Sequence, residues 1–184
     1  MHVFDRLLHR APDGSLPPWL AASWQAISNT IREFHLRPGA HWHDGAEVTA
    51  DDVAFTIDRV RSVPNSPGGF GGLVRAIAST DTVDQLTIRL HTNGPAPNLP
   101  GDLSSLAIVS RHVGATATTA DYNQGKAMVG SGPYRLAHHV NGDRIELDRN
   151  DAWWGPKLPW EHVRISMLVN TAVRTAALLS GTWT

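Results

Sequence analysis

The feature that most constrains the fold is a helix signal set between segments that are patterned as strands. Thr49 is followed three residues later by Asp52, which is the arrangement of an N-terminal capping box. Apolar side chains follow at a spacing that places them on one helical face, namely Val53, Ile57 and Val60. Pro64 then ends the pattern. The sequence therefore predicts an amphipathic helix that starts near Thr49, and no other long helix is expected in the first hundred residues.

Strand patterns and tight-turn pairs surround this helix. Residues 30–36 predict a strand, and alternating apolar residues at 83–90 predict a hairpin that turns near Asp84-Gln85. Asn141-Gly142, a strong short-range signal for a hairpin turn, separates two strand-like segments within residues 134–149. Strands together with a well-marked helix predict an α/β fold.

The remaining segments carry weaker patterns. They predict a short buried strand at 106–109, a loop at 64–72, a polar surface segment at 114–125, a strand at 163–169 and a helix at 171–180 that Gly181 ends. The inner residues of this last helix are expected to be Val173, Ala176, Ala177 and Leu179. Gly39 and Gly45 permit backbone angles that a side chain disfavours, so each predicts a turn. Large aromatic side chains are expected in packing positions: Trp24, Trp42, Trp153 and Trp154.

Composition excludes several classes of protein. An apolar fraction of 41%, a charged fraction of 18% and a formal net charge of −1 are typical of a globular protein and not of a disordered chain or a basic nucleic-acid binder. No stretch approaches the ~18 consecutive apolar residues of a membrane-spanning helix, and no secretory signal follows Met1. The chain has 0 cysteines, which excludes disulfides, iron–sulfur clusters and thiol nucleophiles. We predict no cofactor and no nucleic-acid partner.

Enzymatic patterns are weak. His41 and His43 are spaced to share one face of a strand and His138-His139 are adjacent, but no third ligand at recognisable spacing joins them. The run Gly130-Ser131-Gly132 is too short for a nucleophile elbow. Asp51-Asp52 begin the predicted helix, where carboxylates meet its dipole favourably. We predict no catalytic residue and no metal site, and a metal-dependent hydrolase that uses the histidines is the alternative from another class.

Several segments resemble one family. The run at 34–55, which contains His43-Asp44-Gly45, is similar to the signature stretch of the family 5 extracellular solute-binding proteins of ABC transporters, the peptide/nickel-binding group. Further segments match in the expected order, at 18–24, 130–134, 149–155 and 174–181, and the resemblance covers nearly the whole chain. One departure is local: residues 26–29 lack the Asp-Gly pair that is common there, which leaves only the turn type open.

The resemblance implies a periplasmic-binding-protein type II-like α/β fold, here an incomplete first lobe with a mixed β-sheet and flanking helices. It implies a core subdomain from about 1–10 plus 128–184 and a smaller subdomain from about 11–127. The second lobe, whose charged residues fix the termini of a peptide in similar proteins, is expected to be missing from this truncated chain, as is the signal region.

The resemblance also implies a function. Similar proteins capture a solute outside the cytoplasmic membrane, in periplasmic, extracellular or lipid-anchored form, and deliver it to a membrane permease of an ABC importer. The implied solutes are peptides, with nickel complexes, sugars and opines as further classes, and the alternative is the solute-sensing domain of a cytoplasmic transcription regulator. Without the second lobe the chain is expected to bind weakly, because a loss of ~4 kcal/mol turns a micromolar binder into a millimolar one. It is also expected to self-associate, because the exposed cleft wall and strand edges leave apolar area and backbone amides without partners.

Two short segments supply candidate solute contacts. Phe70 follows Gly69 in a glycine-rich loop, and a large ring there predicts an apolar contact with solute on the surface that faces the second lobe. The alternative, a ring that folds back onto its own subdomain, stays open. Ser131, Gly132 and Tyr134 belong to a stretch whose small residues allow close backbone approach, and in similar proteins it lies near the solute cleft. A tight turn that enters a strand explains it equally well.

Overall fold

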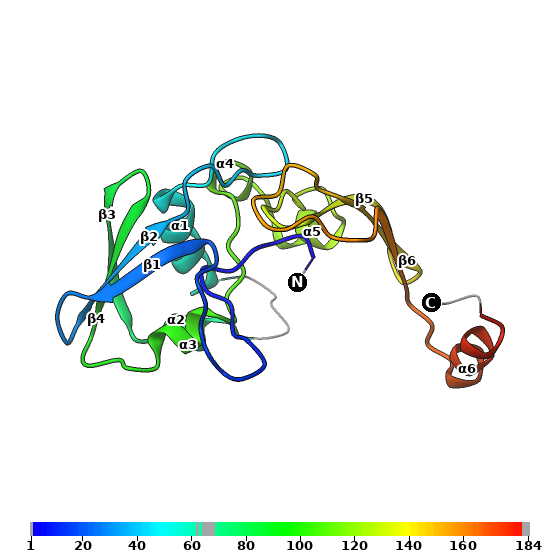
Figure 1. The fold of residues 1–184 in the computed structure, drawn as a ribbon, viewed down its shortest axis with the longest axis horizontal. Helices are drawn as coiled ribbons and strands as arrows, with labels where there is room; N and C mark the ends of the chain where they lie inside the picture. The colour runs from blue at the N-terminus through cyan, green and yellow to red at the C-terminus, as the bar shows by residue number, and fades with distance from the viewer. Residues whose placement is uncertain (1, 62, 64–68, 182–184) are drawn as a thin grey trace.

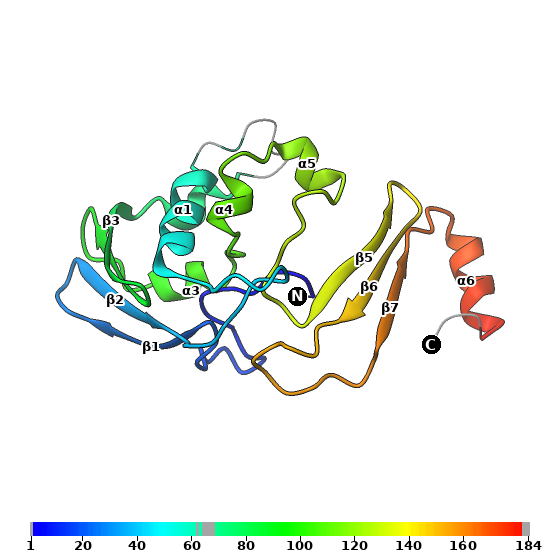
Figure 2. The same cartoon turned by 90° about the horizontal axis from the view of Figure 1, so that it is seen from above.

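The computed structural model describes residues 2–61, 63 and 69–181, which form an elongated molecule with a β-sheet toward each end (Figure 1). Loops and short helices lie between the four-stranded sheet and the three-stranded sheet in both views (Figures 1 and 2). Helix α6 (Thr171–Leu179) lies beyond the second sheet. Helices and strands alternate along the chain, which confirms the α/β class.

The first sheet forms most of the core of the N-terminal half. In spatial order its strands are β1 (Ala21–Ala26), β2 (Ile31–Leu36), β4 (Thr87–Thr92) and β3 (Ile77–Asp84). Phe34 pairs with Ile88 across the sheet, and both side chains are fully buried. The strand predicted at 30–36 and the hairpin turning near Asp84-Gln85 are confirmed, whereas β1 was not predicted.

Helix α1 (Ala50–Val60) covers one face of this sheet, as Figure 2 shows. The predicted capping box is confirmed, because a carboxylate oxygen of Asp52 accepts a hydrogen bond from the backbone N–H of Thr49 at 2.8 Å. The apolar face is confirmed as well, since Val53 and Ile57 are fully buried. Shorter helices complete this half of the chain: α2 (Gly71–Val74), α3 (Leu99–Leu103), α4 (Arg111–Gly114) and α5 (Thr119–Asn123).

The second sheet has its own small core. Its strands, in spatial order, are β5 (Tyr134–Val140), β6 (Arg144–Arg149) and β7 (His162–Ser166). Gly142 has a φ of 74° in the turn between β5 and β6, which confirms the hairpin predicted at Asn141-Gly142. The buried side chains of Tyr134 and Leu147 pack with Val3. All strand pairs described in the two sheets are antiparallel, so these strands alone do not form the mixed sheet that the resemblance implies.

The N-terminal segment, residues 2–8, forms hydrogen bonds with both halves of the molecule. The backbone N–H of Ala21, at the start of β1, donates to the carbonyl of Leu7 at 2.8 Å. The N–H of Gly132, just before β5, donates to the carbonyl of Val3 at 2.9 Å. The same short segment therefore joins the two sheets. The division into the two subdomains expected from the resemblance stays a prediction.

One local prediction in the middle of the chain is wrong. The segment 106–109 is not a strand, because only Ala107 forms an isolated bridge, to Arg6 in the irregular N-terminal segment. The polar segment 114–125 lies mostly at the surface as predicted, and it contains α5, which was not predicted. A second capping box starts that helix, and Asp121 accepts the N–H of its cap residue at 2.8 Å.

The predictions for two further segments are only partly met. The predicted loop at 64–72 lies largely outside the described residues, and within them α2 begins at Gly71. Helix α6 and its end at Gly181, which has a φ of 66°, are confirmed. Its expected inner residues are wrong, because none of the four is buried: Val173, Ala176, Ala177 and Leu179. None of the helices in the described part of the chain is long and apolar enough to cross a membrane.

Candidate functional site

A groove of about 270 Å³ opens beside the C-terminal half of α1. Its walls come from α1, from the segment 105–109, from α5 and from the residue that precedes α2. The residues that line it are Thr56, Arg59, Val60, Val63, Phe70, Ser105, Leu106, Ala107, Val109, Thr119 and Tyr122. Segments that are far apart in the sequence thus form one largely apolar surface.

Polar groups in the groove are mostly engaged by the protein itself. The hydroxyl of Thr56 donates to the carbonyl of Asp52 at 2.8 Å and accepts the N–H of Val109 at 3.0 Å. The guanidinium of Arg59 lies 4.9 Å from the centroid of the Tyr122 ring. Burial raises the pKa of Tyr122, so its phenol stays neutral at neutral pH. The groove therefore offers rings and methyl groups more than free hydrogen-bonding groups.

Phe70 is placed on this groove. Its side chain is 52% exposed, and its carbonyl accepts the N–H of Leu73 at 3.0 Å in the first turn of α2. The ring is therefore not fully packed beneath α1, and the alternative of a ring that folds back onto its own subdomain stays open. Gly69 is exposed beside it, and a Cβ atom added at Gly69 would have no atom of another residue within 4 Å. Contact of Phe70 and Gly69 with solute stays a prediction.

The second set of predicted contacts lies elsewhere. Ser131 is 0% exposed and Tyr134 is 3% exposed, so neither side chain faces a surface of the chain. A Cβ on Gly130 would lie 1.8 Å from the carbonyl oxygen of Val3, and one on Gly132 would lie 2.7 Å from the same oxygen. The close backbone approach that the sequence predicts is present, and the N-terminal segment is what approaches. The structure does not bring these residues together with Phe70, and their contact with solute stays a prediction.

His43 holds this glycine stretch from the other side. Its backbone N–H donates to the carbonyl of Gly130 at 2.8 Å. Its Nδ1 accepts the N–H of Gly130 at 3.2 Å, so the ring proton is on Nε2, which donates to the carbonyl of Gly132 at 3.0 Å. Burial lowers the pKa of His43 and favours this neutral form. We call this set of hydrogen bonds between His43, Gly130 and Gly132 the histidine latch.

A buried carboxylate lies on the opposite side of the same junction. Asp5 is 2% exposed, and its carboxylate accepts indole N–H groups from Trp19 at 3.0 Å and from Trp153 and Trp154 at 3.2 Å each. Burial raises the pKa of Asp5, and the three indole donors oppose that rise. Trp153 and Trp154 are packing residues, as the sequence predicts. No sequence signal indicates that they share one carboxylate with Trp19. This cluster joins the N-terminal segment to the loop after β6.

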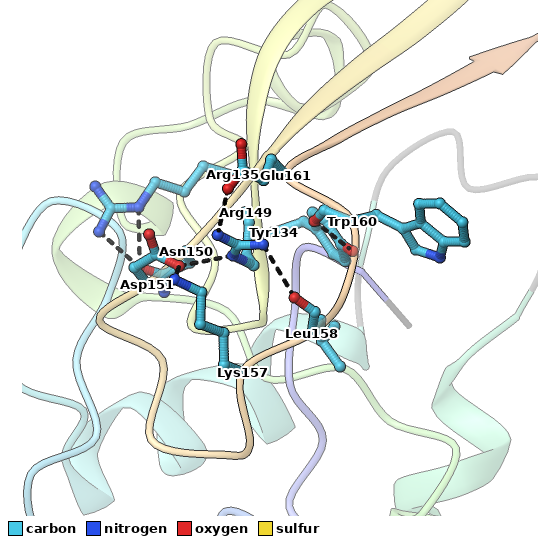
Figure 3. Close-up of polar contacts among 9 residues, drawn as sticks. All are labelled: Tyr134, Arg135, Arg149, Asn150, Asp151, Lys157, Leu158, Trp160 and Glu161. Carbon is cyan, nitrogen blue, oxygen red and sulfur yellow. Dashed lines mark hydrogen bonds and ion pairs between the residues drawn. The ribbon is translucent and has the colours of Figure 1, made fainter.

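Arg149 organises that loop (Figure 3). Its side chain is 8% exposed and forms ion pairs with Asp151 at 2.6 Å and with Glu161 at 3.1 Å. A further N–H donates to the carbonyl of Leu158 at 3.0 Å, so one guanidinium holds both ends of the loop. Trp160 is 66% exposed at its edge. Arg149 therefore has a structural role, because its guanidinium already pairs with groups of the protein itself.

The histidines do not assemble into a metal centre. Both ring nitrogens of His43 are used in the histidine latch, and Nδ1 of His41 lies 2.8 Å from the carbonyl of Gly39. Within the described residues, no group of three or more His, Cys, Asp or Glu side chains is arranged to hold a metal ion. Nothing in the described chain therefore favours metal chemistry at the positions that the sequence singled out.

Comparison with known families decides the relationship of the chain. The family model of the bacterial extracellular solute-binding proteins, family 5 (middle region), matches residues 15–183. The chain belongs to this family. The resemblance inferred from the signature stretch at 34–55 is thereby confirmed, together with the implied type of fold.

Relatives of this family 5 chain agree with that placement. The dipeptide-binding protein of Escherichia coli is 28% identical over 88% of this chain and 34% of its own length. The solute-binding protein MoaA of A. tumefaciens R10, solved with mannopinic acid, is 27% identical with a TM-score of 0.87 over 98% of this chain and 38% of its own. NikZ of Campylobacter jejuni, solved with Ni(L-His), has a TM-score of 0.88 over 98% of this chain and 36% of its own. At 24% identity, it shows the shared fold alone.

This family 5 chain thus spans about a third of the length of these relatives. The relatives are solute-binding proteins and not enzymes, so the hydrolase alternative gains no support. Sequence reasoning found Phe70 from its glycine-rich surroundings. It missed Tyr122 and the segment 105–109, the other walls of the groove, because nothing local in a sequence shows which distant segments meet.

Proposed function

We propose that this chain is the first-lobe portion of the solute-binding component of an ABC importer. The observation that carries the proposal is the family match over residues 15–183. The component would capture its solute outside the cytoplasmic membrane, in the periplasm or extracellular space, and deliver it to a membrane permease. Its solute would be a peptide, with nickel complexes, sugars and opines as the competing classes. The dipeptide-binding relative supports the peptide class.

We also infer a division of this lobe into a core subdomain and a smaller subdomain near the boundaries 1–10 plus 128–184 and 11–127. Two separate clusters of buried side chains support it, one around the first sheet and α1, the other around Tyr134 and Leu147. The N-terminal segment and the histidine latch would hold the two subdomains together.

Within this lobe, the groove beside α1 is the proposed solute contact. It is open, its ring at Phe70 is half-exposed, and its walls are held by the capped helix α1 and by buried residues such as Leu106. A preformed apolar surface with few free polar groups is typical of ligand sites. Closure by a second lobe would then remove the solute from water, which is how two-lobed clamps gain affinity.

A titration of the 184-residue chain, followed by ¹⁵N–¹H correlation NMR, tests the proposal. Dipeptides, nickel–histidine, a neutral disaccharide and an opine are added to millimolar concentration, because one lobe is expected to bind weakly. Peptides are expected to shift amide signals of the groove around Phe70, and Phe70→Ala should abolish these shifts. Trp160→Ala, which removes an exposed aromatic ring far along the chain, is the matched control. If none of the four classes perturbs the groove, the proposed solute contact is wrong.

A further inference from the structure

The chemistry of the groove specifies what kind of group it accepts. Resting on the proposed function, we propose that it binds the uncharged, apolar side chain of a peptide solute, and that it discriminates against the carboxylate and polyol groups of opines, sugars and metal chelates. Its lining supplies Val60, Leu106, Ala107 and Val109 as aliphatic walls, with the rings of Phe70 and Tyr122. Burial of apolar surface against such walls is favourable. A polar group that loses its hydration there forms no hydrogen bond in exchange, so its burial is unfavourable.

The hydrogen-bonding groups of the walls support this specificity. The Thr56 hydroxyl both donates and accepts within the protein. Thr119 has an interaction of its own within the chain. The other two hydroxyls of the lining are those of Ser105 and Tyr122. A hydroxyl-rich solute would therefore find few partners for the bonds with water that it loses, and each polar group buried without a partner lowers affinity.

Charge in the groove leads to the same conclusion. Arg59 is the one charged residue among the described residues that line it. Its guanidinium stacks on Tyr122 at 4.9 Å, and an N–H donates to the carbonyl of Gly114 at 3.4 Å. A carboxylate would pair best with a cation that has no other contacts, whereas this guanidinium already contacts a ring and a carbonyl of the protein. The remaining lining is uncharged, so it favours an uncharged group.

Size limits the occupant to part of a solute. The cavity measures about 270 Å³. Whole drug-sized ligands occupy pockets of roughly 300–1,000 Å³, so the groove accommodates one bulky side chain and leaves little space for the rest of a peptide. The exposed edge of Phe70 would contact an aromatic or branched aliphatic group. The rest of the peptide would extend toward the space that a second lobe closes.

The test compares capped amino acids that differ only in the side chain. N-acetyl amides of phenylalanine, leucine, asparagine and aspartate are titrated into the 184-residue chain and followed by ¹⁵N–¹H NMR at residues of the groove. The phenylalanine and leucine amides are expected to bind at least about tenfold more tightly than the asparagine and aspartate amides, as the burial of several methylene equivalents predicts.

Variants separate specificity from folding. Val109→Thr keeps the volume of a groove wall but adds a hydroxyl, and it should weaken the leucine amide at least about threefold while leaving the asparagine amide unchanged. Val83→Thr makes the same chemical change on β3, where the side chain is 44% exposed outside the groove, and it should have no effect.

The outcomes distinguish the two proposals. If asparagine or aspartate amides bind at the groove as well as leucine or better, the apolar specificity is refuted while the groove remains a solute contact. If no amide, and no solute of the earlier panel, perturbs the groove, the proposed contact itself fails and the specificity fails with it.

Discussion

Removal of the His43 side chain should loosen the junction between the two sheets. The side chain accepts one N–H at 3.2 Å, from Gly130, and donates to one carbonyl at 3.0 Å, that of Gly132. The Gly132 carbonyl keeps a second donor, the Asn150 side chain at 3.2 Å, but Gly130 is buried and loses its acceptor. Loss of the bond to Gly132 costs about 1 kcal/mol, and the buried N–H of Gly130 left without its acceptor costs about 1–3 kcal/mol. His43→Ala should therefore lower the free energy of unfolding by about 2–4 kcal/mol.

Acid should act on the same contact. The pKa of His43 is lowered mainly by burial and also by the charge of Arg135, while the hydrogen bond to the carbonyl of Gly132 and the carboxylate of Asp44 oppose the change. With a folded pKa below the unfolded value of about 6.5, the unfolded chain binds the proton first as pH falls. The contribution of His43 is thus complete above pH ~6.5 and is lost as pH falls toward the folded pKa, by at most about 1.4 kcal/mol per pH unit.

Urea unfolding followed by tryptophan fluorescence between pH 5 and 8 measures both effects. His43→Asn keeps an oxygen near the position of Nδ1, so it should retain the bond from Gly130, lose only about 1 kcal/mol and abolish the His43 share of the pH dependence. His138→Asn, at an exposed position on β5, is the matched control and should keep the pH slope of the wild-type chain. The reasoning is refuted if His43→Asn and wild type have the same slope, or if His43→Ala costs less than about 0.5 kcal/mol.

Other variants probe the same junction. Asp5→Ala leaves three indole N–H groups without their acceptor and should lower the free energy of unfolding in urea by about 3–5 kcal/mol. Asp5→Asn keeps an acceptor and should lower it less. Equal losses in the two variants would contradict the hydrogen-bond account. Because burial raises the pKa of Asp5, its ionisation costs stability as pH rises through that pKa, and Asp5→Asn should remove this loss. Gly130→Ala places a methyl group 1.8 Å from the Val3 carbonyl and should cost at least about 3 kcal/mol. Gly94→Ala, with open space around it, is the control for thermal unfolding, and a similar loss in both would contradict the close approach.

Local signals in the sequence predicted those elements that local interactions define. The start of α1 follows from the capping box of Thr49 and Asp52, and the hairpin at Asn141-Gly142 follows from a turn that requires positive φ. Strand β1 escaped prediction because it is an edge strand whose side chains are mostly exposed or half-buried, so its sequence lacks the alternation of apolar residues that marks a strand. The apolar run at 106–109 predicted burial correctly for Leu106, but burial alone does not specify a strand partner.

The candidate site shows the same limit. A ring in a glycine-rich loop marks Phe70 as unusual, because such a loop has little core to bury it. The rest of the groove depends on contacts between α1, α5 and the segment 105–109, which are set by packing of the whole chain. The stretch around Ser131 shows the opposite case: small residues predicted a close approach, but only the structure identifies the N-terminal segment as the partner.

The position of Asp5 has a consequence for synthesis of the protein. Its indole partner Trp154 lies 149 residues later in the chain. At about 5–20 residues per second, a ribosome needs roughly 8–30 s between these two residues. Trp19 and Ala21 follow Asp5 closely in the chain, but Trp153 and Trp154 are made only at the end of that interval, and the glycine stretch at 130–132 shortly before them. The junction between the two sheets can therefore be completed only after the whole stretch between Asp5 and Trp154 has been made, whereas α1 and the first sheet need no contact of that separation.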